Sequence, residues 1–137
     1  MLRTQIFVNL PVKDLKASVA FFTELGFTFN PKFTDDNATC MEIGENIFAM
    51  LLLEKFFQTF TRKPVADATT ATEAIIALSV DSRESVDELV DKALAAGAST
   101  PNDPQDHGFM YVRSFGDPDG HHWEIFHMDE SAQPPHE

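Results

Sequence analysis

The two halves of the chain repeat one order of elements. The segment 6–12 (IFVNLPV) aligns with the segment 74–80 (AIIALSV) at a shift of 68 residues, and each is followed by an amphipathic run that ends at a glycine, Gly26 or Gly97. A β-α-β-β-β unit cannot cover both faces of its own sheet, whereas two such units side by side bury a shared concavity. We therefore predict an α+β fold in which two tandem βαβββ modules form a cupped, incompletely closed barrel around a ligand site.

The first half is expected to contain one helix and about four short strands. Asp14 is a suitable N-cap, and apolar side chains follow it at helical spacing until Gly26 ends the pattern. The β-rich runs of this half predict strands at 5–10, 27–33, 39–43 and 47–53.

The second half shows the same signals. Ser82 is the expected N-cap of a helix that Gly97 ends, and the runs around it predict strands at 73–80, 110–115 and 121–128, an irregular segment at 100–104 and a tight turn at 117–120. The whole is expected to be one domain over residues 1–130, with modules at about 1–55 and 73–130, a partly helical connector at 56–72 and a flexible tail at 131–137.

The charge balance excludes two classes of partner. The chain of 137 residues carries 22 Asp and Glu against 10 Lys and Arg, a formal charge of -12. The resulting field repels phosphate backbones and anionic lipid headgroups. We therefore expect no nucleic acid and no membrane surface as a partner.

Cysteine content and the N-terminal residues bear on the compartment. Cys40 is the single cysteine, so the chain has no internal disulfide, which fits a reducing compartment. The longest apolar run, 47–53, is too short to span a bilayer, and the first residues lack the pattern of a signal peptide. These features predict a cytoplasmic protein.

Several motifs resemble one superfamily. Val-Lys-Asp-Leu before the first helix, Ala-Leu-Ser-Val-Asp before the second, and Asp-Pro-Asp-Gly-x-x-x-Glu before the last strand are similar to the vicinal-oxygen-chelate superfamily of glyoxalase I, extradiol dioxygenases and bleomycin-resistance proteins. The runs FFTELGF and PQDHGFMY look like its branch of predicted lactoylglutathione lyases. The resemblance covers nearly the whole chain and implies a glyoxalase-like domain that binds a small molecule and forms a homodimer.

The same resemblance implies a metal site at four positions, one on the first and one on the last strand of each module. Here those positions fall on Phe7, near Leu51, on Ile75 and on Glu124. Only Glu124 has a metal-ligating side chain, and one carboxylate does not hold a divalent ion that takes four to six donors. We therefore expect no metal and no other cofactor.

A relocated metal site is the alternative. Strand alternation places His122 on the same face as Glu124, and His107 precedes the neighbouring strand. A His-His-Glu set is chemically suitable for Zn, Ni or Fe. The competing interpretation is a hydrogen-bonded histidine on the rim of the barrel.

Alternation and the resemblance together predict the lining of the cup. It is mostly apolar with a few polar groups, as is usual for a small-molecule pocket. The expected substrate-binding residues are Phe7, Asn9, Leu51, Ile75, His107, Tyr111, Arg113 and His122. Two alternatives remain at this stage: the apolar side chains fill the cup as core, and Arg113 forms a salt bridge instead of anchoring a ligand carboxylate.

The leading functional hypothesis is a glyoxalase-like protein, related to predicted lactoylglutathione lyases, that binds a small organic molecule without the usual metal. The alternatives are a metal-dependent lyase or dioxygenase with relocated ligands, and a non-catalytic sequestering protein of the bleomycin-resistance type. If the protein is an enzyme, we expect a glyoxalase I-like lyase or isomerase in which Glu124 is the catalytic acid or base, since a carboxylate there is suited to moving a proton beside a carbonyl.

Overall fold

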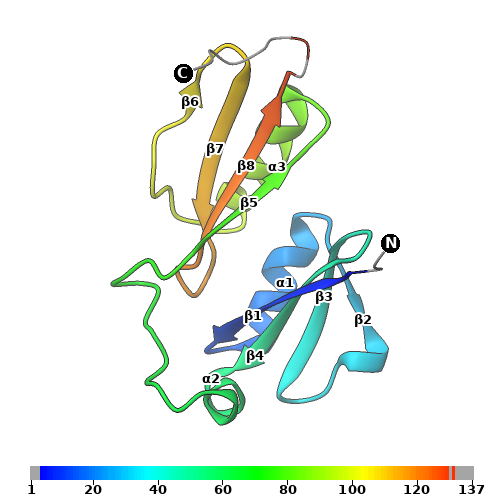
Figure 1. The fold of residues 1–137 in the computed structure, drawn as a ribbon, viewed down its shortest axis with the longest axis vertical. Coiled ribbons are helices and arrows are strands. Elements are labelled where there is room, and N and C mark those ends of the chain that lie inside the picture. Colours follow the sequence, from blue (N-terminus) through cyan, green and yellow to red (C-terminus); the bar gives the residue numbers. More distant parts are fainter. Residues whose placement is uncertain (1–3, 130, 132–137) are drawn as a thin grey trace. The chain divides into compact units, whose positions relative to one another are not determined.

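The computed structural model describes residues 4–129 and 131. The chain divides into two compact units, 1–67 and 68–137, with the boundary inside the segment predicted to connect the modules. Each unit contains a four-stranded mixed sheet and one long helix that lies against it (Figure 1). The predicted α+β fold of two modules is confirmed.

The first unit has its sheet in the order β1-β4-β3-β2, with β1 parallel to β4 and the other pairs antiparallel. Its elements are β1 (Ile6–Val12), α1 (Leu15–Glu24), β2 (Thr28–Asn30), β3 (Ala38–Gly44) and β4 (Ile47–Leu53). The strand expected at 27–33 is wrong in its second half. Asn30 accepts a hydrogen bond from the Lys32 amide, and Pro31–Phe33 forms a 3-10 turn.

Helix α1 begins and ends where the sequence predicts. The Asp14 side chain accepts a hydrogen bond of 3.1 Å from the Ala17 amide, which satisfies one of the free N–H groups of the first turn. Gly26 follows the helix at a φ of 102°, a conformation that disfavours other residues. Phe21 and Phe22 are buried, so α1 contributes the aromatic part of this unit's core.

The second unit repeats the arrangement, with the sheet order β5-β8-β7-β6 and β5 parallel to β8. Its elements are β5 (Ile75–Ser79), α3 (Arg83–Ala95), β6 (Gln105–Asp106), β7 (Met110–Gly116) and β8 (His122–Met128). Ser82 caps α3 as predicted, and Gly97 follows it at a φ of 101°. The short edge strand β6 was not predicted, because a two-residue strand has no alternation to detect.

The connector is partly helical, as predicted. It contains α2 (Glu54–Phe57) and the 3-10 helix η2 (Gln58–Phe60), after which most residues up to β5 have no regular structure. The tail expected at 131–137 lies outside the described residues, apart from Ser131. Within the described ranges, no helix has the length and apolar character needed to cross a membrane.

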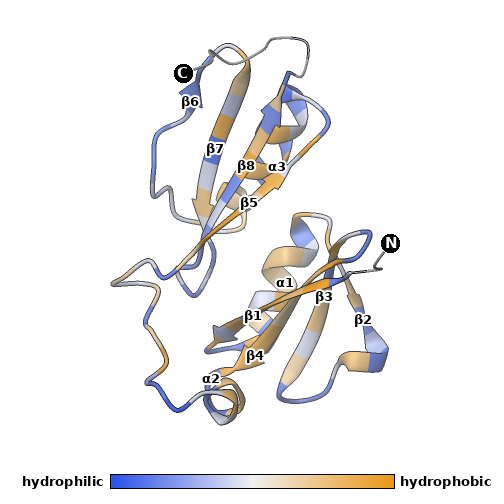
Figure 2. Ribbon diagram, viewed as in Figure 1, coloured by the Kyte–Doolittle hydropathy of each residue, from blue (hydrophilic) through white to orange (hydrophobic). Residues whose placement is uncertain are grey.

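Burial alternates along the last strand and defines the two faces of the second sheet. Trp123 and Ile125 are fully buried, whereas His122, Glu124 and Phe126 between them are partly exposed. The buried face packs on α3 through side chains that include Val90. A sheet with one covered face fixes its register, because a slip by one residue would expose the whole apolar set. Figure 2 shows the apolar character concentrated in strands such as β4 and β5.

A buried carboxylate organises the turn between β7 and β8. Asp117 accepts hydrogen bonds of 3.0 Å from the amides of Asp119 and His121 and from Nε1 of Trp123. Burial raises the pKa of the Asp117 carboxyl, against the smaller opposing effects of His121 and these hydrogen bonds. Gly120 completes the turn at a φ of 85°, and a Cβ there would lie 2.9 Å from the Ala68 carbonyl oxygen. The turn and the segment 68–69 therefore approach each other backbone to backbone.

Replacing Gly120 by Ala should destabilise the protein more than replacing Gly108 by Ala. Both glycines have a positive φ, which costs an alanine about 1 to 2 kcal/mol, but only the Gly120 variant places its Cβ against backbone. The additional clash should cost about 1 to 3 kcal/mol in the free energy of unfolding, measured by urea denaturation. Equal losses in the two variants would show that the segment 68–69 is not held against the turn.

Candidate functional site

Three of the predicted site residues lie together on the face of the second sheet opposite α3. The register pairs Ile75 with His122 on one side, and Ala77 and Ser114 with Glu124 on either side. Residues paired across neighbouring strands project to the same face. Among the described strand residues of this face, Glu124 is the single carboxylate.

His122 and Glu124 form the polar centre of this face. The His122 Nε2 atom lies 3.5 Å from Oε2 of Glu124, and the two side chains are 10% and 29% exposed. The pair is within ion-pair distance, yet Nε2 makes no hydrogen bond and is buried. A buried polar atom without a partner costs free energy, which a ligand that bonds to it would recover. This atom is therefore the clearest candidate for a ligand contact in the unit.

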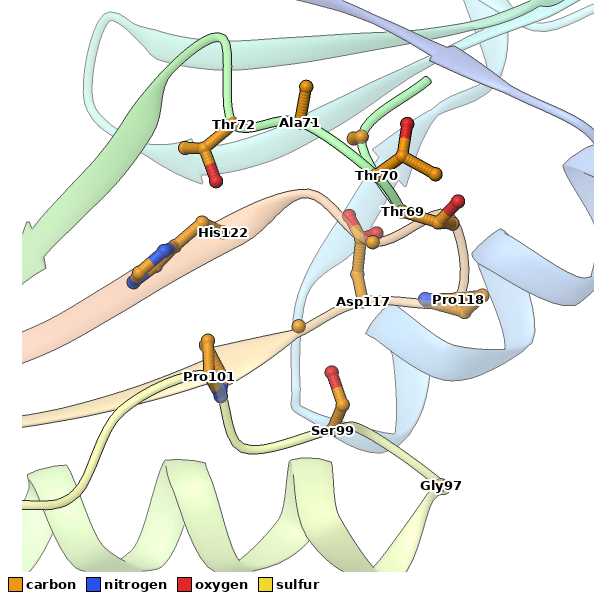
Figure 3. Close-up of a pocket in the computed structure, with 13 residues that line it drawn as sticks. Thr69, Thr70, Ala71, Thr72, Gly97, Ser99, Pro101, Asp117, Pro118 and His122 are labelled. Carbon is orange, nitrogen blue, oxygen red and sulfur yellow. The ribbon is translucent and has the colours of Figure 1, made fainter.

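A hollow of about 550 Å³ adjoins His122 (Figure 3). One wall is the segment 68–72, the second is formed by Gly97, Ser99 and Pro101, and the third by the turn that contains Asp117. Sequence reasoning missed this hollow, because its walls come from a connector and two turns that carry no periodic pattern. The hydroxyl-rich run Thr69-Thr70-Ala71-Thr72 was the available signal.

Phe7 and Asn9 lie on the corresponding face of the first sheet. Phe7 is 45% exposed and stacks on Phe48 with the ring centroids 4.8 Å apart. The Asn9 side-chain amide donates to the Phe7 carbonyl oxygen at 3.0 Å. Their partners across the strand pair are Phe48 and Met50. This face is apolar and accessible within its own unit.

The placement of Leu51 on that face is wrong. The register pairs Leu51 with Leu10, and both are buried on the opposite side of the sheet, in the core that α1 covers. The strand was predicted in the right place, but its phase was off by one residue, because the run 47–53 is apolar throughout and does not alternate. Met50 takes the position that matches Glu124 in the second unit.

Tyr111 and Arg113 lie on the α3 face, across the sheet from Glu124. The Tyr111 hydroxyl donates to Asp87 at 2.6 Å, and the Arg113 guanidinium donates to Asp87 at 3.0 Å and to Asp91 at 2.9 Å. Arg113 is thus part of a salt bridge, and it neither pairs with Glu124 nor stands beside it as a ligand anchor. Tyr111 also stacks under the guanidinium of Arg83, which is paired with Asp106.

His107 does not join His122. Its ring is exposed, lies 3.3 Å from the Gln105 side-chain oxygen and precedes the Met110 end of β7. Met110 pairs with Met128, which is six residues along β8 from His122, or about 20 Å at strand spacing. In the described part of the chain, no three His, Cys, Asp or Glu side chains gather in a metal-binding arrangement. The predicted His-His-Glu set is therefore not assembled.

The metal implied by the resemblance does not fit the residues present. Its four positions are occupied by Phe7, stacked on Phe48, by Met50, by Ile75 and by Glu124. The donor set is therefore one carboxylate with His122 beside it, too few groups for a stable divalent site.

Comparison with known proteins defines the class. A family model described as "bleomycin resistance protein-like N-terminal" matches residues 4–44. The structure of hypothetical protein SA1046 from S. aureus is 32% identical with a TM-score of 0.77, over 92% of this chain and 94% of that one. No curated protein matches the sequence.

Two further structures share the fold at lower identity. A glyoxalase/bleomycin resistance protein/dioxygenase family enzyme from Burkholderia phytofirmans PsJN is 21% identical with a TM-score of 0.74, over 89% of this chain and 96% of that one. A glyoxalase-related enzyme from Fulvimarina pelagi is 22% identical with a TM-score of 0.75, over 92% and 88%. The chain has the glyoxalase/bleomycin-resistance fold. It belongs to one family with SA1046.

Replacing Arg113 by Met should lower stability without affecting any ligand at His122. The change removes two hydrogen-bonded ion pairs from a largely buried guanidinium and should cost about 1 to 2 kcal/mol of unfolding free energy. Replacing the exposed Lys92, which pairs with Glu88, by Met should cost less than about 0.5 kcal/mol. Urea denaturation measures both, and a loss of ligand affinity in the Arg113 variant would contradict this assignment.

The pH dependence of stability should report the same network. The Tyr111 hydroxyl, followed by Arg113, lowers the pKa of Asp87. A lowered carboxyl pKa adds stability that is complete above the ordinary Asp value and is lost as the pH falls through the lowered one. The stability difference between the Asp87→Asn variant and the unchanged protein should therefore shrink on acidification. A difference that stays constant down to acid unfolding would refute the assignment.

Proposed function

We propose that this protein binds a small organic molecule on the face of the second sheet that carries His122 and Glu124, and that it does so without the usual metal of the superfamily. The observation that supports this most directly is the buried Nε2 atom of His122, which has no hydrogen-bond partner. It lies beside a carboxylate and at the edge of a hollow. Convergent polar groups at a concavity are typical of a ligand site.

Glu124 is the proposed acid or base if the bound molecule reacts. Its carboxylate is the acidic group of this face, and the His122 imidazole lies 3.5 Å from it. We also propose that the protein is related to predicted lactoylglutathione lyases by descent, without sharing their reaction. The chain lacks three of the four implied ligands, so the hemithioacetal of methylglyoxal and glutathione should not be turned over, with or without added Ni or Zn.

Chemical-shift mapping of the labelled protein tests the location of the site. We expect at least one of benzyl alcohol, dihydroxyacetone, glucose and glucuronate to perturb the amides of Ile75, Ser114 and His122. Glu124→Gln keeps the shape and removes the charge, so it should weaken this binding while the melting temperature stays unchanged. Glu88→Gln, on the exposed side of α3, removes the same charge and should leave binding unaltered.

Two results would contradict the proposal. Perturbations confined to the α3 side of the unit would place the site elsewhere. A Glu124→Gln variant that is unchanged in stability, ligand binding and activity would show that this face is not the working site. A drop of several degrees in melting temperature with binding unchanged would give Glu124 a structural role alone.

Metal content is the second test. Protein purified without an affinity tag and without added metal should carry well under one equivalent of Zn, Ni, Mn or Fe by elemental analysis. Stoichiometric metal would favour the alternative of relocated ligands through His122 and Glu124. In that event His122→Ala should abolish the metal binding, because His107 is remote from Glu124.

We further propose that the protein is a homodimer. The resemblance implies one, and large apolar side chains remain exposed among the described residues, including Ile6, Phe33 and Phe60. Light scattering at micromolar concentration should give about twice the chain mass of 15.3 kDa. A monomer throughout a dilution series that spans about a hundredfold would contradict the dimer.

A further inference from the structure

The hollow beside His122 is lined mostly by small side chains, several of which carry a hydroxyl group. Its lining residues include Thr72 on one wall and Ser99 on another, both of which carry a hydroxyl group, together with alanine and glycine residues (Figure 3). A hydroxyl both donates and accepts hydrogen bonds. The surface is therefore suited to a ligand that does the same, and small side chains let the ligand approach the backbone closely.

Within the described part of residues 68–137, no Lys or Arg lines the hollow. Residues 68–137 contain three Lys and Arg residues, and each is paired with a carboxylate: Arg83 with Asp106, Lys92 with Glu88, and Arg113 with Asp87 and Asp91. Arg113 stands on the α3 face and none of the three lines the hollow. A carboxylate or phosphate ligand would have to leave water without gaining a charged partner, which is costly.

No available anion faces the hollow either. Asp117 is the one carboxylate in its lining, and its oxygens already accept three hydrogen bonds, from two amides and the Trp123 indole. Glu124 is not part of the lining. Its Oε2 atom lies 3.5 Å from His122 Nε2, within ion-pair distance of that group. Among the lining residues themselves, a cationic ligand therefore finds no carboxylate that is not already hydrogen-bonded.

His122 is the group that remains. Its side chain is nine-tenths buried, it lines the hollow from β8, and its Nε2 has no hydrogen-bond partner. In a neutral imidazole this nitrogen either donates or accepts, depending on the tautomer, and a ligand hydroxyl satisfies both cases. The polar groups of Thr72, Ser99 and His122 are thus all suited to ligand hydroxyl groups.

We propose that the hollow formed by residues 68–72, 97–101 and 116–122 binds an uncharged polyhydroxyl compound of monosaccharide size or smaller, with a ligand hydroxyl on His122 Nε2. The volume of about 550 Å³ lies in the range of small-molecule sites and accommodates a pyranose ring. This inference rests on the proposed function, whose site it extends, and it states which molecules are accepted and which are rejected.

A matched set of sugars tests the inference. Glucose, glucuronate and glucosamine share one ring and differ in charge, and chemical-shift titration at low ionic strength compares them. Glucose should perturb the amides of 68–72 and 117–122 and bind about tenfold more tightly than glucuronate, the effect of one poorly compensated charge. Glucosamine should also bind more weakly than glucose.

Two variants probe the contact with the ligand. His122→Phe keeps an aromatic ring and removes the nitrogen, and Thr72→Val removes one hydroxyl at constant shape. Each should weaken glucose binding about three- to tenfold, the value of one hydrogen bond. The melting temperature shows whether the variants fold, and Thr72 is exposed, so its variant preserves the test if His122→Phe does not fold.

A third variant reverses the selectivity. Ala71→Lys adds a cation to the exposed wall segment and should raise glucuronate affinity to about that of glucose. Glu88→Gln changes the net charge by the same amount on α3 and should leave the preference for glucose intact. A preference that shifts equally in both variants would mean that overall charge, and not the hollow, selects the ligand.

The outcomes separate this inference from the proposed function. If benzyl alcohol or glucuronate binds beside His122 and glucose does not, the inference is wrong and the proposed function stands. Tighter binding of glucosamine or glucuronate than of glucose also overturns the inference. If none of the probes perturbs this face, both are wrong.

Discussion

One long helix covers one face of each four-stranded sheet, and this coverage determines which residues form the core and which lie on the uncovered face. On the covered side apolar side chains such as Trp123 and Ile125 pack under α3, and Tyr111 and Arg113 bond to its aspartates. On the other side the strands can present His122, Glu124 or Phe7 without loss of the core. Because successive side chains of a strand point to opposite faces, core residues alternate along the strand with residues of the uncovered face. Substitutions on one face need not disturb the other.

Asp117 links the folding of the second unit to its hollow. A buried carboxylate that accepts three hydrogen bonds holds the turn, the indole of Trp123 and the start of β8 in one arrangement. The backbone approach of Gly120 to Ala68 then seats the wall segment against that turn. His122 directly follows His121, whose amide is one of the donors to Asp117. The position of His122 therefore depends on the hydrogen bonds of Asp117.

The sequence predicted the modules, both helices with their caps, and β4 to the residue, because capping groups, closing glycines and periodicity are local signals. It also placed His122, Glu124 and Ile75 on one face, since β8 alternates clearly. It failed for Leu51, whose strand is apolar on both faces, and left Arg113 undecided until its partners on α3 were seen. Contacts between elements far apart in the chain, such as that of residues 68–69 with the turn, carry no local pattern.

The distribution of chromophores gives the two units different optical properties. Trp123 and Tyr111 are the chain's single tryptophan and single tyrosine, and both belong to the second unit. Intrinsic fluorescence excited at the indole band therefore originates entirely in residues 68–137, from a ring that is fully buried and stacked at 6.2 Å on Phe115. The first unit contributes phenylalanine absorption alone. Emission consequently reports on the second unit alone, whereas far-ultraviolet circular dichroism reports on the backbone of both units. Any divergence between the two unfolding curves therefore measures how independently the two modules melt.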